Sequence, residues 1–424
     1  MRIRYLVFMV LLGLPLAGWS NGFQVNLQGT RQQGRGNVGY GFRPDASSVF
    51  YNPGAMGFLS GSQAVIGGSL IFSNTVFSPL SDADLGIYTD QVYSTDNPLG
   101  TPFFAYGVFK PQETSSLSNF TFGVGVFTPF GSSVDWGEDW YGQYALQEIS
   151  LEAIYIRPAV SYQITESLGI GLTLDFILGG AEVTRGLPIN SATVNDPNVN
   201  LDGNADVAIS FSAGVYFQPS DQWSFGLNYR HGVDVSIVKG DVDLEVPEQL
   251  SPLFQGTTFD ATLPLPSVIG GGIGYYPTDR LSLGVDVSFI TWSDYEELRF
   301  DFDAPIGGEL SSVSERNYKN SWIFNIGGEY KVTDAFTATA GMYYDLSPVE
   351  DGFMSPETPD SDAFGFTAGV AYQVTEKIGI NGSFLFLTKR ERENIVPSGV
   401  ETGGVSGTYK SNGFIPSIAV QYSF

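Results

Sequence analysis

The sequence predicts an all-β fold, a transmembrane antiparallel β-barrel of about fourteen strands with an N-terminal hatch, or plug, inside its lumen. Three observations predict it. Apolar residues alternate with small or polar ones through repeated hairpin phrases. Tight turns alternate with long loops along the chain. The last strand alternates in the same way and runs to an aromatic carboxyl-terminal residue, Phe424.

Residues 1–20 have the three parts of a secretory signal peptide. Two arginines form the positively charged n-region, and residues 5–16 form an apolar run. Small residues then favour cleavage between Ser20 and Asn21. A membrane anchor is the alternative, but a spanning helix needs about 20 apolar residues and this run is shorter. The chain has no Cys, which excludes a lipoprotein anchor. We expect the mature protein to be an integral component of the bacterial outer membrane.

The segment that follows, residues 21–60, is rich in Gly and polar groups and lacks a sustained strand period. A floppy periplasmic tail is one interpretation. Its apolar anchors are uncommon in disordered tails and favour a compact hatch inside the lumen. These anchors are Phe23, Val25, Phe42, Val49, Phe50, Tyr51 and Phe58. The remaining residues, 61–424, are expected to form the barrel, and a plugged lumen is not an open pore.

Five hairpin phrases mark the barrel strands. Each ends a strand on an aromatic residue, turns through a few polar residues and restarts with alternating apolar positions. The turns lie around Thr165, Ser220, Thr278, Thr333 and Thr375. A soluble sandwich would bury the apolar face against a second sheet, whereas a barrel turns it to lipid. Periodicity alone does not separate the two.

The lengths of the connections favour the barrel. The short turns alternate with long connections rich in Asp, Pro, Gly and Ser, as periplasmic turns alternate with external loops in outer-membrane barrels. The long connections lie near Asp82, Asp139, Asn195, Gln249, Ser311, Glu357 and Ser406. Counting from a first strand near residues 64–72 to the last gives about fourteen strands, an even number, so that both ends lie in the periplasm.

Composition excludes several classes of function. Twenty basic residues against 45 acidic ones, a net charge of −25, argue against a nucleic-acid partner. With no Cys and one histidine, His231, a metal site or a Ser-His-Asp triad is disfavoured. We therefore expect no enzyme activity, no metal and no cofactor. A general diffusion porin and an outer-membrane enzyme or adhesin are the competing classes.

Several phrases resemble, in the same order, those of the long-chain fatty acid transporter (FadL/TodX-like) family of outer-membrane barrels, which includes toluene and xylene uptake channels. The similarity covers nearly the whole mature chain. Residues 21–24 look like the family's N-terminus, and Asn52-Pro53-Gly54 resembles the Asn-Pro-Ala motif that ends its hatch. The other phrases are VFTPFG at 126–131, LPLPS at 263–267, TWSDYEEL at 291–298 and YYDLSPV at 343–349.

The resemblance implies passive uptake of long-chain fatty acids or similar hydrophobic compounds, with lateral release through a gap where the third strand kinks. It places the kink at Thr128, Pro129, Phe130 and Gly131. Pro129 lacks the N–H that a strand ladder needs, which makes an interruption of the wall plausible at this point. The alternative is that Pro129 simply ends the strand.

The same resemblance assigns the ligand contacts. Arg185 and Lys319 fall where fatty-acid-binding members place pocket cations for the carboxylate head group, and Phe23 would contact the alkyl chain. The alternative is that both cations sit at strand ends and pair with loop carboxylates. Gly54 replaces the family's usual Ala, and we expect little steric effect from that change but a looser turn in the hatch.

The expected partners are a fatty acid or other hydrophobic small molecule, outer-membrane lipids and lipopolysaccharide. The barrel-assembly machinery is expected to recognise the C-terminal Phe424, and the protein is expected to be a monomer. The alternative function is an uptake channel for uncharged aromatic or aliphatic hydrocarbons.

Overall fold

The alternation of side chains sets the inner and outer faces of each strand. The computed structural model describes residues 22–80, 91–96, 99–191 and 193–424, so the expected signal peptide lies outside the described residues. In β7 (Leu168–Gly186), Leu172 and Leu174 are 58% and 43% exposed, whereas Thr173 and Asp175 are buried. A sandwich would bury the leucines against a second sheet. The apolar face instead points outward, as in a barrel wall in lipid.

Fourteen antiparallel strands of the described chain form a closed ring, in which β22 pairs with β1. This confirms the predicted fold class and strand number. In order around the ring, the strands are β1 (Gln63–Ser69), β4 (Phe103–Phe109), β5 (Phe120–Asp135), β6 (Glu148–Thr165), β7, β9 (Ala208–Ser220), β10 (Trp223–Arg230), β13 (Val268–Tyr275), β14 (Leu281–Ile290), β17 (Ser321–Lys331), β18 (Phe336–Asp345), β19 (Ala363–Gln373), β20 (Ile378–Lys389) and β22 (Gly407–Ser423).

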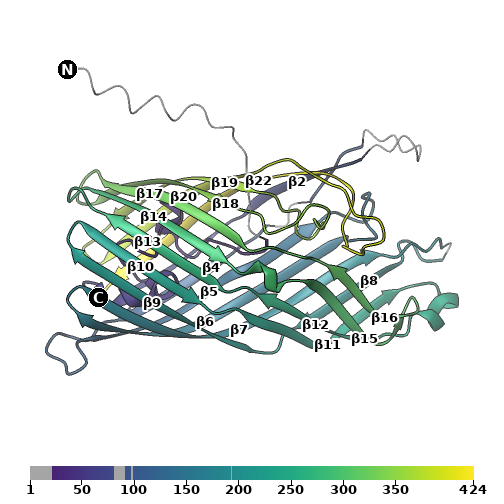
Figure 1. The fold of residues 1–424 in the computed structure, drawn as a ribbon, viewed down its shortest axis with the longest axis horizontal. Coiled ribbons are helices and arrows are strands. Elements are labelled where there is room, and N and C mark those ends of the chain that lie inside the picture. The colour runs from purple at the N-terminus through teal and green to yellow at the C-terminus, as the bar shows by residue number, and fades with distance from the viewer. Residues whose placement is uncertain (1–21, 81–90, 97–98, 192) are drawn as a thin grey trace, which may run out of the picture.

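Further strands extend the barrel at the end opposite the C-terminus, where β8, β15 and β16 lie at the right of Figure 1. They are β2 (Phe72–Pro79), β3 (Tyr93–Ser94), β8 (Asn198–Asn204), β11 (Val233–Glu245), β12 (Thr258–Leu265), β15 (Glu297–Ile306), β16 (Glu309–Glu315) and β21 (Arg392–Asn394). All five predicted tight turns join consecutive ring strands. The short 3₁₀ helices η2 (Glu248–Leu253) and η3 (Trp292–Asp294) belong to the long connections.

One of the predicted long connections contains a hairpin. Ser311 lies in β16, which pairs with β15, and both strands belong to the long connection between the ring strands β14 and β17. Gly307 and Gly308 join the two strands with φ of 65° and 95°. Consecutive positive φ angles are those of a type I′ turn, which matches the twist of the paired strands.

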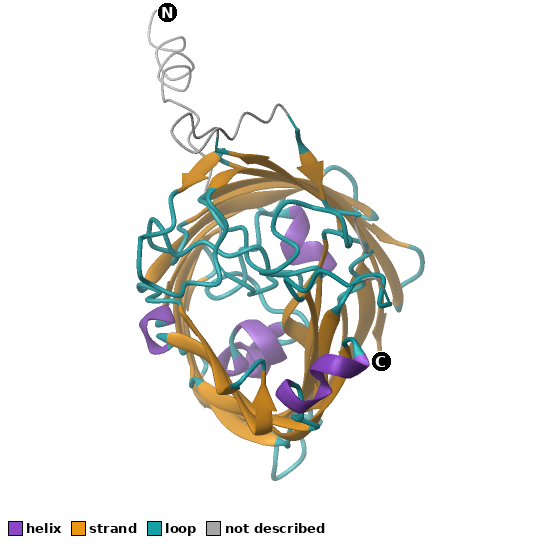
Figure 2. Ribbon diagram, turned by 90° about the vertical axis from the view of Figure 1, so that its right-hand side faces the viewer, coloured by secondary structure: helices purple, strands orange, loops and turns teal. Residues whose placement is uncertain are grey.

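Residues 22–59 lie inside the ring and carry three short helices. The helices are α1 (Thr30–Gly34), α2 (Ser48–Tyr51) and the 3₁₀ helix η1 (Pro53–Phe58). α1 contacts β18, β19, β20, β22 and β1, whereas η1 contacts β5, β6, β7 and β9 on another part of the ring. Figure 2, a view along the barrel, shows helices within the ring and loops folded across its opening. None of the helices in the described part of the chain is long and apolar enough to cross a membrane.

Carboxylates on the inner face of the wall hold this N-terminal segment. Glu329 of β17 accepts hydrogen bonds from both Arg31 and Arg35. Asp286 of β14 accepts from the backbone N–H groups of Gly39 and Tyr40. These polar residues alternate with lipid-facing apolar ones, so the pattern that builds the wall also supplies the contacts to the segment.

Inward-facing glycines let the segment lie directly against the wall. A Cβ atom added at Gly226 of β10 would stand 1.8 Å from the Tyr40 carbonyl oxygen, and one at Gly171 of β7 would stand 2.3 Å from the Pro53 carbonyl carbon. Both of these atoms belong to the backbone, so they cannot turn away as the end of a flexible side chain could. The Gly content of these strands therefore reflects a backbone-to-backbone contact that other residues would prevent.

We predict that Gly226→Ala loosens the N-terminal segment while the ring still forms. Overpacking costs about 1–3 kcal/mol, so the population of the displaced segment should rise roughly five-fold or more. Tryptic cleavage after Arg35, which is buried in the closed state, measures that population. Gly61→Ala is the matched control, because an added Cβ there meets nothing within 4 Å. Equal cleavage of both variants would contradict the steric account.

Candidate functional site

The barrel wall is interrupted at β5, the third strand of the ring. β4 pairs with β5 only as far as Phe127, although β5 runs on to Asp135. On the other side, the register with β6 shifts between Phe127 and Phe130. Such a bulge accommodates Pro129, which has no N–H to donate. Pro129 therefore bends the strand and does not end it.

The N-terminal segment takes the place of β4 along this edge. The N–H of Val25 donates to the carbonyl of Pro129 at 2.8 Å, and the N–H of Gly131 donates to the carbonyl of Phe23 at 3.1 Å. An open strand edge at membrane depth would leave costly unsatisfied polar groups. Residues 23–25 satisfy part of this edge from inside the barrel.

The other two predicted kink residues meet the same segment. Gln24 lies opposite Phe130 in antiparallel register. The carbonyl of Thr128 accepts from the Gln28 side chain at 3.1 Å, and its hydroxyl accepts from the N–H of Phe103 at 3.3 Å. All four residues predicted from the resemblance thus surround one short break in the ladder.

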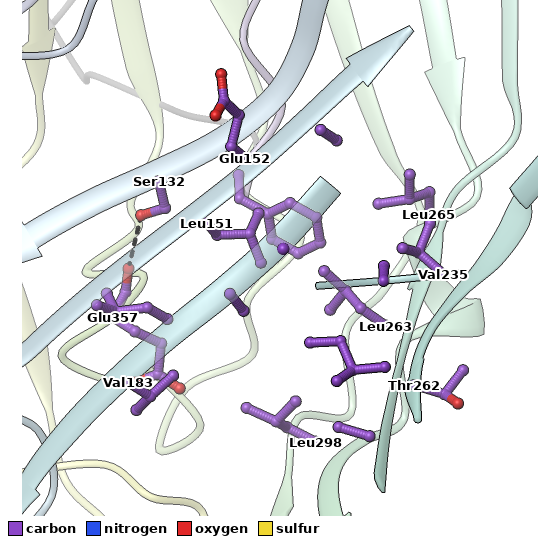
Figure 3. A pocket seen from close by; sticks show the side chains of 18 of the residues that line it. Ser132, Leu151, Glu152, Val183, Val235, Thr262, Leu263, Leu265, Leu298 and Glu357 are labelled. Carbon is purple, nitrogen blue, oxygen red and sulfur yellow. Dashed lines mark hydrogen bonds between the residues drawn. The ribbon is translucent and has the colours of Figure 1, made fainter. Parts of the chain in front are cut away.

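A narrow apolar cavity of about 80 Å³ lies beside this break. We call it the apolar cavity (Figure 3). Phe23 forms part of its wall, and the ring of Phe23 packs against Trp292 at 4.8 Å and Phe130 at 6.0 Å between centroids. The aliphatic lining includes Leu151, Val183, Val235, Leu263, Leu265 and Leu298. The predicted contact residue Phe23 is therefore placed between an apolar space and the break in the wall.

A second cavity of about 630 Å³, the outer cavity, adjoins the first. The two share Ile149, Val183, Leu298, Phe300 and Glu357. Arg185, at the end of β7, is part of its lining. The guanidinium donates to the Ser312 hydroxyl at 3.4 Å, and no carboxylate of the described residues lies within 4 Å of it. Arg185 is thus a cation without a committed ion pair, facing a space large enough for a ligand.

The second cation of the outer cavity is already neutralised. Arg316 forms an ion pair with Glu357 and donates to the carbonyl of Thr402 at 2.9 Å. Burial acts to lower the pKa of Arg316, but Glu357, Tyr295 and Tyr318 together outweigh it, and the pKa is raised above its ordinary value. Arg316 therefore ties loops together, and no pattern in the sequence predicted this pairing.

Lys319 is not brought together with Arg185 in either cavity. It lines neither one, is more than half exposed, and pairs with Glu350 at 3.1 Å. This placement matches the alternative of a strand-end cation paired with a loop carboxylate. The structure favours Arg185 over Lys319 for any role in the cavities.

Asn52, Pro53 and Gly54 lie against the wall rather than at a cavity. The Asn52 amide donates to the carbonyls of Tyr40 and Val215, both at 3.0 Å, and its oxygen caps the N–H of Gly54. Pro53 follows at the first position of η1, where its missing N–H costs nothing. The motif joins the N-terminal segment to β9.

The expectation that Gly54 is sterically neutral was wrong. A Cβ atom at this position would stand 2.7 Å from the carbonyl oxygen of Gly214 and 3.0 Å from that of Gly169. Backbone atoms of β9 and β7 would have to move before an Ala could fit. Gly54 is therefore matched to the glycines that face it.

A fully buried ion pair lies deeper in the barrel and escaped sequence reasoning. Arg157 of β6 and Asp175 of β7 pair at 2.6 Å, and the Arg157 side chain also donates to the carbonyl of Phe50 at 3.2 Å. The available signal was a charged residue at an inward position of each apolar strand. Among the described residues, no group of three or more His, Cys, Asp or Glu side chains is placed to hold a metal ion.

The ring is thus a closed barrel with an apolar outside, an N-terminal segment packed on the inner face of its wall and two adjoining cavities, an architecture of outer-membrane β-barrel proteins. Residues 14–424 match the family model described as outer membrane protein transport protein (OMPP1/FadL/TodX). The chain belongs to this family. Localisation in the bacterial outer membrane follows, and so does a role in transport rather than catalysis.

Individual relatives are distant. The long-chain fatty acid transport protein of Salmonella typhi is 20% identical over 397 residues, which cover 86% of each chain. A FadL homologue of Pseudomonas aeruginosa superposes with a TM-score of 0.80 at 20% identity, over 95% of this chain and 100% of that one. The toluene transporter TodX of P. putida gives 0.70 at 13% identity, over 93% and 98%. At these identities, the solved structures support the fold alone.

Proposed function

We propose that the protein takes up long-chain fatty acids or similar hydrophobic carboxylates passively across the outer membrane, with residues 22–59 acting as the hatch. The observation that carries the proposal is Arg185, an uncommitted guanidinium in a cavity that adjoins an apolar one. A guanidinium can bind a carboxylate through two parallel hydrogen bonds. The apolar cavity next to it would take the start of the alkyl chain.

The proposed route continues through the wall. Phe23 separates the apolar cavity from Phe130 at the break in β5. Movement of residues 23–25 away from β5 would remove this ring and open the strand edge in one step. The ligand would then leave sideways into the bilayer, where its alkyl chain is more stable than in water.

Uptake of uncharged hydrocarbons is the second candidate. The lining of the apolar cavity is mostly aliphatic or aromatic, and its polar members, among them Glu152 and Glu357, include no cation. A hydrocarbon would need only this space. The family contains relatives of both kinds, since one is named a long-chain fatty acid transport protein and another a toluene transporter.

We also propose that the C-terminal Phe424 carries the signal for barrel assembly. Phe424 is 71% exposed and packs on Tyr422 at the end of the closing strand β22. The exposed apolar band of the ring would contact outer-membrane lipid, with lipopolysaccharide around the external loops. A monomer is sufficient to close the ring, because β22 pairs with β1 within one chain.

Replacing Arg185 by Gln should separate the two candidate substrates. We expect the affinity for oleate to fall roughly ten-fold, because a charge-assisted hydrogen bond is lost, while toluene binding is unchanged. Competitive binding of the two ligands to purified protein measures both. Lys319→Gln is the matched control, since that cation is exposed and lies outside both cavities. Unchanged oleate affinity in Arg185→Gln would remove the head-group assignment.

A reversible tether tests lateral release. Gln24 and Phe130 face each other between two flanking hydrogen bonds, a non-hydrogen-bonded pair whose Cα atoms should lie about 4.5 Å apart. That spacing suits a disulfide, and the natural chain contains no Cys. We expect the oxidised double variant Gln24→Cys/Phe130→Cys to take up oleate several-fold more slowly than its reduced form. The single variants control for loss of either side chain. Equal uptake by oxidised and reduced protein would exclude release through this gap.

A further inference from the structure

Arg230, the last residue of β10, is a buried cation without a counter-ion. Its side chain is 5% exposed, and its Nε is buried with no hydrogen-bond partner. Within the described chain its guanidinium takes part in no ion pair. By contrast, Arg157, another buried arginine of the wall, is held by Asp175 at 2.6 Å and 2.8 Å. Because a buried charge is costly unless it is paired, the missing partner of Arg230 needs an explanation.

Aromatic rings supply only part of the compensation. The guanidinium carbon lies 5.3 Å from the ring centre of Phe50 in α2 and 5.5 Å from that of Phe130 in β5. Contacts of this kind are worth about 0.5–2 kcal/mol, less than the cost of an unpaired buried charge. Rings occupy the faces of a guanidinium, whereas its edge carries the N–H donors that bind a carboxylate.

The position of Arg230 connects it to the proposed route. Phe130 belongs to the break in the wall, and Phe23 packs on Phe130 while lining the apolar cavity. The rings of Phe23 and Phe130 therefore separate Arg230 from that cavity. Arg230 lies between the N-terminal segment and the gap. A ligand passing Phe23 would meet this cation before it reached the bilayer.

We propose that Arg230 is a second carboxylate-binding station, which receives the head group of a fatty acid when Phe23 moves aside and holds it at the inner side of the wall gap. The inference rests on the proposed function and deepens it. Arg185 would hold the head group in the outer cavity, and Arg230 would hold it during release. An uncharged hydrocarbon would use the same path without either cation.

Two probes with the same alkyl chain test this role. Uptake of oleate and of oleyl alcohol, which differ in the charged head group, is measured in cells that depend on this protein for both. We expect Arg230→Met to slow oleate uptake roughly ten-fold and to leave oleyl alcohol uptake and the equilibrium oleate affinity of the outer cavity unchanged. Arg230→Lys should restore most of the oleate rate. Arg299→Gln, an exposed cation paired with Asp301, is the control for loss of positive charge.

Unchanged oleate uptake in Arg230→Met would overturn the proposal. An equal loss of uptake for both probes would also overturn it, because that result indicates a structural role. Failure of the wild-type protein to take up either probe would instead refute the proposed function, and no variant is needed to see it. If Arg230→Met does not assemble, a crystal structure of the wild-type protein soaked with 6-bromohexanoate decides. Bromine and carboxylate density at the Arg230 guanidinium supports the station, and an empty site overturns it.

Discussion

The structure depends on the close approach of the N-terminal segment to the inner face of the wall. That approach is a backbone contact, made where β7, β9 and β10 present glycines instead of side chains. Gly171 faces Pro53, and Gly226 faces the Tyr40 carbonyl. With the backbones in contact, Asp286 and Glu329 reach the N–H groups and arginines of the segment. The N-terminal segment fits against the wall because glycines at these wall positions leave room for its backbone. Side chains at the same wall positions would exclude it.

The same contact fixes the start of the segment at the break in β5. Once α1 and η1 are held on different parts of the ring, the residues before them reach the edge that β4 leaves unpaired. Phe23 and Val25 then complete that edge through backbone hydrogen bonds. Few such bonds close the gap, whereas β20 is joined to its neighbours β19 and β22 by uninterrupted ladders. The weakest part of the wall is therefore the part that the N-terminal segment closes, which is the physical basis for proposing release at this point.

The sequence predicted the fold well because period-two alternation is a local property. It identified the wall faces and the tight turns, and counting turns and loops gave the strand number. It predicted a long connection near Ser311 but not the hairpin of β15 and β16 within it. The family resemblance located the break at residues 128–131, since Pro129 and its neighbours form a recognisable phrase.

Contacts between distant segments were harder to predict. The Arg157–Asp175 pair, the isolation of Arg230 and the pairing of Lys319 with Glu350 depend on strand register and on where loops fold. Gly54 appeared neutral because the backbones of β7 and β9 that exclude a Cβ are far away in sequence. Alternation indicates that a charged residue points inward. It does not indicate what that residue meets there.

Single-channel conductance in planar bilayers tests most directly whether residues 22–59 close the lumen. We expect the intact protein to show no steady ion conductance, because the segment fills the ring. A variant lacking residues 24–58 should show large, steady steps like those of a general porin. Porin-like conductance of the intact protein, equal to that of the deletion variant, would contradict the account.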